Sequence, residues 1–237
     1  MTDAMFRLGT FEADGRRFAG MVLGEIVVDL ATAAPAFADA RPAHRTSAPG
    51  SLLGLLADWD RNFAALQECA AVAVAEGAES DRLRGAVHKL SALRVLAPVQ
   101  RPPKMLYAAA NYREHVEGMR RTFRKEGLAE IDPAKDYKAE KNQAQPYLFA
   151  KAVTSLSGPY DDIVIPPGME RIDWEAELAV VIGRPGKNIP AARAMDHVAG
   201  FMTTNDVSCR DRTFRPDRPG IRSDWLGGKS WDSFAPM

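Results

Sequence analysis

The segment Asp173–Gly183 reads DWEAELAVVIG, and it decides how the rest of the chain is interpreted. Its second half is as apolar as a buried strand, whereas its first half carries Glu175 and Glu177. Because side chains alternate between the two faces of a strand, both carboxylates are expected on one face. Two neighbouring acids at a partly buried position repel each other and need a compensating charge. The pattern leaves two interpretations, a solvent-facing edge strand or a site for a divalent cation.

A second acidic motif, TTNDVSCRD at residues 203–211, strengthens the second interpretation. The stretch 199–208 predicts a strand, and Asp206 stands near its end, where a turn would aim the carboxylate into a shared cleft. Three carboxylates without a neighbouring Cys or His cluster fit a hard cation such as Mg²⁺, Mn²⁺ or Ca²⁺ better than zinc. Asp206 alone has a simpler explanation as a turn cap.

Composition limits the classes of protein that fit. The 237 residues carry 31 Lys plus Arg and 31 Asp plus Glu, so no net charge attracts nucleic acid or an anionic membrane. The basic stretch RRTFRKE is short and balanced by acids, as on a solvated helix face. No secretory signal or membrane-spanning run is visible, and Cys69 and Cys209 form no metal or disulfide spacing. We expect a cytoplasmic protein with one large domain or one large and one small domain.

The chain divides at the stretch APVQRPPKM, residues 97–105. Residues 1–90 predict a small lobe with short strands, turns at Asp14-Gly15 and Gly24-Glu25, and a loop from about residue 33 to 50. One helical stripe is expected in this lobe, formed by Leu52, Leu55, Leu56, Trp59, Phe63 and Leu66. A chemically richer domain is expected over residues 101–237, with strands near 147–151 and 163–165.

The motif NYREHVEGMRR opens this second domain. Asn111 followed by Glu114 matches a capping box, so a helix is expected to begin at Asn111. His115 would lie in its first turn, where the helix dipole favours a neutral imidazole that can act as a base. A surface histidine on a charged helix is the alternative. The charged segment 120–145 predicts either a solvated helix and loop or a mobile lid.

Five motifs occur in a fixed order: NYREH, PYLFAKAVTSLSGPYDDIVIPPG, DWEAELAVVIG, GFMTTNDVSCRD and GGKSWDSFAPM. Together they resemble the fumarylacetoacetate hydrolase family, in its branch of 2-hydroxyhepta-2,4-diene-1,7-dioate isomerases and acylpyruvate hydrolases, over about residues 101–237. The resemblance implies an α+β, mainly β fold, with a mixed β-roll catalytic domain after a small N-terminal α+β lobe. It also implies a homodimer with a divalent metal in the mouth of the roll.

The resemblance assigns roles residue by residue. It makes Glu175, Glu177 and Asp206 the metal ligands. It makes His115 the general base or water activator, and Lys229 the cation that stabilises developing enolate charge. Substrate contacts are implied for Lys151, Tyr112 and Arg113. In the implied reaction the metal chelates a 2-oxo acid, His115 activates water, and C–C cleavage leaves an enolate.

Three positions depart from the family pattern. Gly118 stands where many members have a glutamate that orients the water, and Glu117 is the nearest substitute. Thr213 replaces a frequent glutamine after the RD pair, so different substrate contacts are expected. Met237 falls inside the F-x-P-M/L-G-P motif, after which the resemblance leads us to expect further strands and a glycine-rich loop.

These residues favour a metal-dependent hydrolase that cleaves a C–C bond in an acylpyruvate- or fumarylpyruvate-like compound from aromatic catabolism. A decarboxylase or isomerase of oxaloacetate-like or 2-oxo-diene acids is the alternative within the family, because the same enolate chemistry serves all three reactions. A non-catalytic binding scaffold is the alternative from another class. Retention of the three carboxylates, His115 and Lys229 argues against it.

Overall fold

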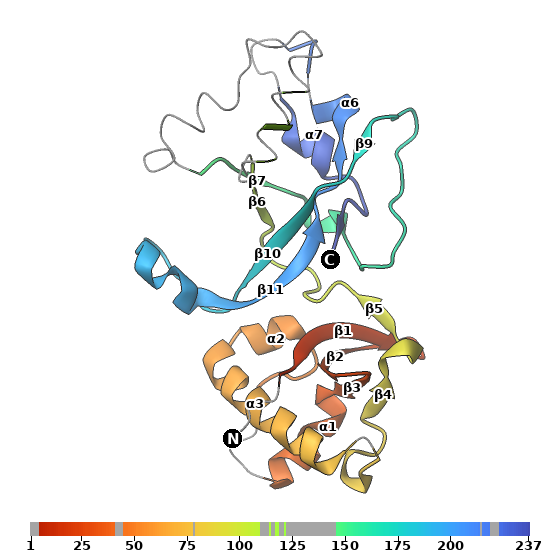
Figure 1. Cartoon of the computed structure of the whole chain (residues 1–237), viewed down its shortest axis with the longest axis vertical. Coiled ribbons are helices and arrows are strands. Elements are labelled where there is room, and N and C mark those ends of the chain that lie inside the picture. Colours follow the sequence, from red (N-terminus) through yellow and green to blue (C-terminus); the bar gives the residue numbers. More distant parts are fainter. Residues whose placement is uncertain are drawn as a thin grey trace. The chain divides into compact units, whose positions relative to one another are not determined.

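The computed structural model describes residues 5–40, 45–77, 79–109, 114, 117–118, 121, 146–213, 215–218 and 223–237 (Figure 1). They belong to two compact units. The first unit combines residues 1–102 with residues 154–237, and the second comprises residues 103–153. Each unit is described by itself below.

The N-terminal part of the first unit is built on one antiparallel sheet with the strand order β4-β3-β2-β1-β5. Its strands are β1 (Arg7–Ala13), β2 (Arg16–Leu23), β3 (Ile26–Asp29), β4 (Val87–Lys89) and β5 (Arg94–Leu96). The predicted turn at Asp14-Gly15 is confirmed, and both residues have positive φ, as a two-residue hairpin requires. The second predicted turn, Gly24-Glu25, joins β2 to β3.

Three helices cover this sheet: α1 (Leu30–Ala40), α2 (Leu52–Leu56) and α3 (Trp59–Glu76). Short 3₁₀ turns follow at η2 (Asp81–Leu83) and η3 (Leu90–Ala92). Leu55 and Leu66 of the predicted stripe are fully buried, but Phe63 is 39% exposed. The stripe is also divided between two helices, because the chain turns at residues 57–58.

Helix α1 occupies residues for which we expected a loop. Asp29 caps its start, since the carboxylate accepts the backbone N–H groups of Ala31 and Thr32 at 3.0 and 3.2 Å. Leu30, Ala33 and Phe37 then lie on the buried face of the helix. The small residues around Pro35 indicate a loop in the sequence. In the folded chain, burial of one apolar face stabilises a helix instead.

The second unit contains an antiparallel pair, β6 (Leu106–Ala108) with β7 (Leu148–Ala150), which confirms the strand expected near 147–151. Tyr107 stacks on Phe149 with ring centroids 5.6 Å apart. Glu117 and Gly118 are helical. The expected helix start at Asn111 and most of the segment 120–145 lie outside the described residues.

The C-terminal part of the first unit carries short paired strands. The elements are η4 (Val153–Ser155, its first residue in the second unit), β8 (Leu156–Ser157), β9 (Ile172–Asp173), β10 (Ala176–Ile182), η5 (Ala191–His197), β11 (Val198–Asn205), β12 (Ser208–Cys209), α6 (Arg210–Thr213), α7 (Trp225–Lys229) and β13 (Ala235–Pro236). β10 pairs with β11 and β9 with β12, both antiparallel, whereas β8 and β13 are parallel. The strand expected over 199–208 is thus present but broken at residues 206–207.

One expectation for this part is wrong. Residues 163–165 form no strand, because Pro166 and Pro167 follow them and Val164 donates its N–H to the Ser233 hydroxyl rather than to a strand.

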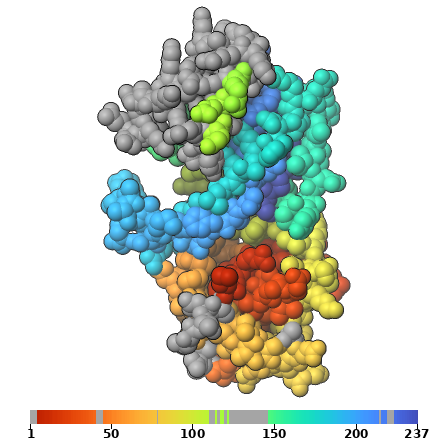
Figure 2. All heavy atoms as spheres, in the orientation of Figure 1, coloured from red at the N-terminus to blue at the C-terminus, as the bar shows by residue number. Residues whose placement is uncertain are grey.

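The apolar half of β10 has the composition of a buried strand but is not fully buried. Leu178, Val180 and Ile182 lie on one face of the strand and are about half or more exposed, and Figure 2 shows the atoms of β10 and β11 at the surface. In the described chain this two-stranded sheet has only one packed face.

Candidate metal centre

The strand pair β10–β11 positions the three acidic side chains. Glu177 lies within β10 opposite Thr204, and Glu175 directly precedes the strand. The side-chain oxygen of Asn205 accepts the Glu175 backbone N–H at 2.9 Å, and the Asp206 backbone N–H donates to the Glu175 carbonyl at 2.9 Å. These two bonds continue the ladder one residue beyond β10, so the backbone of Glu175 is held against the turn that carries Asp206.

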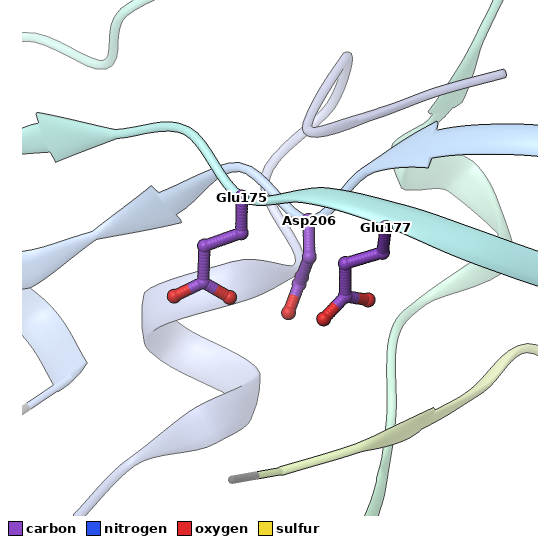
Figure 3. A group of neighbouring side chains, drawn as sticks. All are labelled: Glu175, Glu177 and Asp206. Carbon is purple, nitrogen blue, oxygen red and sulfur yellow. The ribbon is translucent and has the colours of Figure 1, made fainter. Parts of the chain in front are cut away.

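The three carboxylates converge on one region (Figure 3). One oxygen each from Glu175, Glu177 and Asp206 lies within 4.8 Å of the others. Asp206 is 1% exposed, and the two glutamates are partly buried. A set of oxygen donors alone matches the preference of Mg²⁺, Mn²⁺ and Ca²⁺. The residues therefore fit a divalent cation of this kind.

Lys229 brings a buried positive charge to the same group. It ends helix α7, and its side chain is 1% exposed. The ammonium donates to Glu175 Oε2 at 2.8 Å, to Asp206 Oδ2 at 2.5 Å and to the Ser208 hydroxyl at 2.7 Å. These three contacts match the three protons that an ammonium group carries. Lys229 is thus placed to orient the carboxylates of Glu175 and Asp206.

Gly228, directly before Lys229, allows helix α7 to approach α6 closely. A Cβ atom on Gly228 would lie 2.5 Å from the Thr213 hydroxyl oxygen and 3.0 Å from the Thr213 Cα. Asp224 caps the start of α7 by accepting the Gly227 N–H at 2.7 Å. Thr213 is buried and donates its hydroxyl to the Cys209 carbonyl at 3.0 Å. At this position the side chain serves packing between helices.

Arg210, which sequence reasoning did not single out, contributes a second cation. Its guanidinium donates to Asp173 Oδ2 from Nε at 3.1 Å and from Nη2 at 2.7 Å, and Nη2 also donates to Glu175 Oε1. The sequence did offer a signal for Arg210, which stands four residues after Asp206. An arginine that is close in sequence to clustered acids is a candidate counter-charge. Ser208 and Asn205 were missed as well, and nothing local distinguishes them from ordinary strand residues.

The charges around Glu175 change its acidity. Burial alone would raise the pKa of the Glu175 carboxyl, but the charge and hydrogen bond of Lys229, followed by those of Arg210, outweigh burial and hold this pKa below its usual range. For Arg210, burial opposes the charged form, but Asp173 and Glu175 together raise the pKa of the guanidinium. Both groups therefore stay ionised at neutral pH.

The other residues named from the sequence lie elsewhere in the chain. Glu117 and Lys151 belong to the second unit, where the Lys151 ammonium lies 5.2 Å from the centre of the Tyr107 ring. His115, Tyr112 and Arg113 lie outside the described residues. The structure thus brings together Glu175, Glu177, Asp206 and Lys229 of the predicted set.

In the described ranges, no helix has the length and apolar character needed to cross a membrane.

A model of the family Fumarylacetoacetate (FAA) hydrolase C-terminal matches residues 104–237, more than half of the chain. The chain therefore belongs to this family, as the five sequence motifs indicated. Human mitochondrial oxaloacetate tautomerase FAHD2A is 41% identical over 147 residues, which cover 62% of this chain and 40% of the relative. The chain thus spans about two fifths of the length of this curated relative.

Solved structures confirm the mixed α+β fold. The fumarylacetoacetate hydrolase of Exiguobacterium antarcticum matches 98% of this chain and 65% of its own, with a TM-score of 0.60 and 23% identity. The 2-hydroxyhepta-2,4-diene-1,7-dioate isomerase of Mycobacterium marinum matches 98% of this chain and 64% of its own, with a TM-score of 0.57 and 22% identity. At these identities the likeness shows the fold.

Proposed function

We propose that Glu175, Glu177 and Asp206 bind one divalent cation, Mg²⁺, Mn²⁺ or Ca²⁺, and that the protein is a metal-dependent enzyme acting on a small 2-oxo acid. The observation that carries the proposal is the convergence of three carboxylate oxygens within 4.8 Å. Charge supports it as well. With Asp173 included, the group has four carboxylates and two cations, Arg210 and Lys229, which pair with Asp173, Glu175 and Asp206. These six side chains carry two net negative charges, which one divalent ion balances.

The reaction we favour is keto–enol interconversion of an oxaloacetate-like 2-oxo acid. A bound divalent ion supplies Lewis-acid chemistry, which draws electron density from the substrate oxygens and favours the enolate form. The relative that is 41% identical is named an oxaloacetate tautomerase, which supports this choice over hydrolysis. Tautomerisation moves one proton and needs no activated water. Gly118 stands where the family resemblance places a water-orienting glutamate. The absence of that glutamate from this position is consistent with a reaction that uses no activated water.

The chain's own residues divide the remaining work. Lys229 and Arg210 keep Glu175 ionised and oriented. In this proposal His115 is the base that removes and returns the substrate proton, with Glu117 as its helper. Lys151, Tyr112 and Arg113 offer cationic and hydroxyl groups for the substrate carboxylates. We further propose a homodimer, on the strength of the family resemblance.

Hydrolysis of an acylpyruvate- or fumarylpyruvate-like compound is the second candidate, and decarboxylation the third. The resemblance of the five motifs together to a family branch that includes acylpyruvate hydrolases supports hydrolysis. The three reactions differ in their products. Tautomerisation removes the ultraviolet absorbance of the enol without releasing a product, hydrolysis releases pyruvate with a second acid, and decarboxylation releases CO₂.

The first test is a thermal melt of the protein in EDTA and in a titration with Mg²⁺, Mn²⁺ or Ca²⁺. A cation that binds only the folded state stabilises it by about 2.7 kcal/mol at one hundred times its dissociation constant. We expect a saturable rise in melting temperature that disappears in Glu177→Ala. Glu170→Ala, which removes an exposed acid outside the cluster, is the matched control and keeps the rise. No rise with any of the three ions in the wild type leaves the non-catalytic scaffold as the better explanation.

A further inference from the structure

The guanidinium of Arg210 is shared between two carboxylates of different exposure. Asp173, on β9, has a side chain that is 48% exposed and accepts two hydrogen bonds from Arg210 through one oxygen. Glu175 has a side chain that is 14% exposed and accepts one hydrogen bond from Nη2. Two of the three contacts thus hold Arg210 toward the strand that precedes the acidic cluster.

Both oxygens of Glu175 face a cation. Oε2 accepts a hydrogen bond from Lys229 at 2.8 Å, and Oε1 accepts one from Arg210. A guanidinium that moved fully onto Glu175 would pair with it through two parallel N–H groups, the strongest arrangement that Arg and a carboxylate form. Such a pair would occupy the lone pairs that a metal ion needs. Arg210 can therefore compete with a cation for Glu175.

The backbone keeps Asp173 within reach of Arg210. Asp173 lies opposite Ser208 in the β9–β12 ladder, and the Arg210 backbone N–H donates to the Arg171 carbonyl at 2.8 Å. Asp173 on β9 and Arg210, the first residue of α6 directly after β12, are therefore held at a fixed register. Asp173 is not among the three carboxylates that converge in the cluster.

We propose that Asp173 is a positioning residue that retains the Arg210 guanidinium and so keeps Glu175 available to a divalent cation. This inference rests on the proposed metal binding and assigns Asp173 a role that the acidic cluster alone does not give it. Partners that orient metal ligands in this way commonly change metal affinity by about ten- to a hundredfold when they are removed.

The test is the dissociation constant of Mn²⁺, measured by electron paramagnetic resonance without substrate. We expect Asp173→Ala to weaken Mn²⁺ binding by about tenfold or more. Asp173→Asn, which keeps an acceptor oxygen but loses the charge, is expected to weaken it less. Asp60→Asn is the matched control, since Asp60 forms a comparable exposed pair with Arg184 at 2.6 Å. The control is expected to leave Mn²⁺ binding unchanged.

Removal of a negative charge near the site weakens cation binding by itself. The effect of Asp173→Ala is therefore also measured in a variant that lacks the Arg210 guanidinium. In Arg210→Met the competing guanidinium is gone, and Asp173→Ala is then expected to have little effect on the Mn²⁺ dissociation constant. An equal loss in both backgrounds overturns the inference, because Asp173 then acts through its charge and not through Arg210.

The proposed function and this inference fail differently. Wild type that binds no Mn²⁺ overturns the metal site and the inference with it. If the wild type and a folded Asp173→Ala variant bind Mn²⁺ equally tightly, only the inference is overturned. Folding of each variant is checked by its melt in EDTA, and if Asp173→Ala is unfolded, the comparison of Asp173→Asn in the two backgrounds decides.

Discussion

Lys229 places one ammonium group against oxygen atoms of Glu175, Asp206 and Ser208, in surroundings that leave it 1% exposed. A charge buried to this extent costs solvation that only good partners offset. The carboxylates also need a compensating positive charge, because they lie close together and repel one another. Each group thus makes the burial of the others tolerable.

We predict that Lys229→Met lowers the free energy of unfolding by about 3–5 kcal/mol in EDTA, because it leaves adjacent buried carboxylates without their cation. Saturating Mn²⁺ is expected to restore part of this loss, since a divalent ion supplies the missing positive charge. Urea denaturation with and without Mn²⁺ measures both effects. Lys187→Met removes an exposed lysine and is the control. Equal losses with and without Mn²⁺ contradict the prediction.

The lowered pKa of Glu175 predicts a dependence of stability on pH. A carboxyl whose pKa is lower in the folded state stabilises the fold fully above its unfolded value of about 4.3 and loses this contribution as pH falls through the folded value. In EDTA, the difference in unfolding free energy between wild type and Glu175→Gln is expected to be constant from pH 8 to 6 and to change in favour of the variant below about pH 4. Denaturation curves over this range test it, and a difference that stays constant down to pH 3 refutes it.

At the scale of elements, the close packing of α7 on α6 decides where Lys229 lies. The tightest contact is Gly228 against the backbone and hydroxyl of Thr213, atoms that cannot yield without moving the α6 backbone. Gly228 of the GGK motif thus provides space for a neighbouring helix.

We predict that Gly228→Ala destabilises the fold by about 1–3 kcal/mol, the usual cost of overpacking. It is also expected to weaken Mn²⁺ binding, because α7 carries Lys229 with it. Gly200→Ala on β11 is the control, since a Cβ there has no atom within 4 Å. Chemical denaturation and Mn²⁺ titration of both variants provide the comparison. A Gly228→Ala variant as stable as wild type would show that α7 can shift without cost.

At the scale of the molecule, the N-terminal lobe carries its own apolar core. The buried cluster that includes Met21, Leu30, Phe37, Leu55 and Leu66 lies within residues 19–86. A second cluster around Phe11 and Phe18 draws only on residues 11–95. The ion pairs Arg94–Asp161 and Arg184–Asp60, which join this part to residues beyond 154, are exposed and therefore contribute little stability.

We therefore predict that residues 1–98 fold without the rest of the chain, with a free energy of unfolding of a few kcal/mol. A cooperative melt followed by circular dichroism and dispersed amide NMR signals are the expected results. A fragment without a cooperative transition would show that the lobe depends on residues after 154, and the proposed division into 1–90 and 101–237 would then have to be abandoned.

Local patterns predicted much of this architecture. Period-two alternation placed Glu175 and Glu177 on one face of a strand, because the geometry of a strand allows nothing else. Two-residue turns at Asp14-Gly15 and Gly24-Glu25 were predictable, since such turns need residues that tolerate positive φ. Helix α1 was not predictable in this way, because Pro35 within the segment indicates a break that offsets the helical preference of the alanines. Burial of Leu30 and Phe37 favours the helix in the folded chain.

By itself the sequence determined which residues can serve as acids and bases, the alternation that pairs Glu175 with Glu177, and membership of the family. Only the tertiary structure decided that Lys229 lies between Glu175 and Asp206, and that Arg210 is shared between Glu175 and Asp173. These contacts join residues 23 to 54 positions apart. Strand register and helix packing set such pairings, and no local periodicity encodes which cation meets which carboxylate.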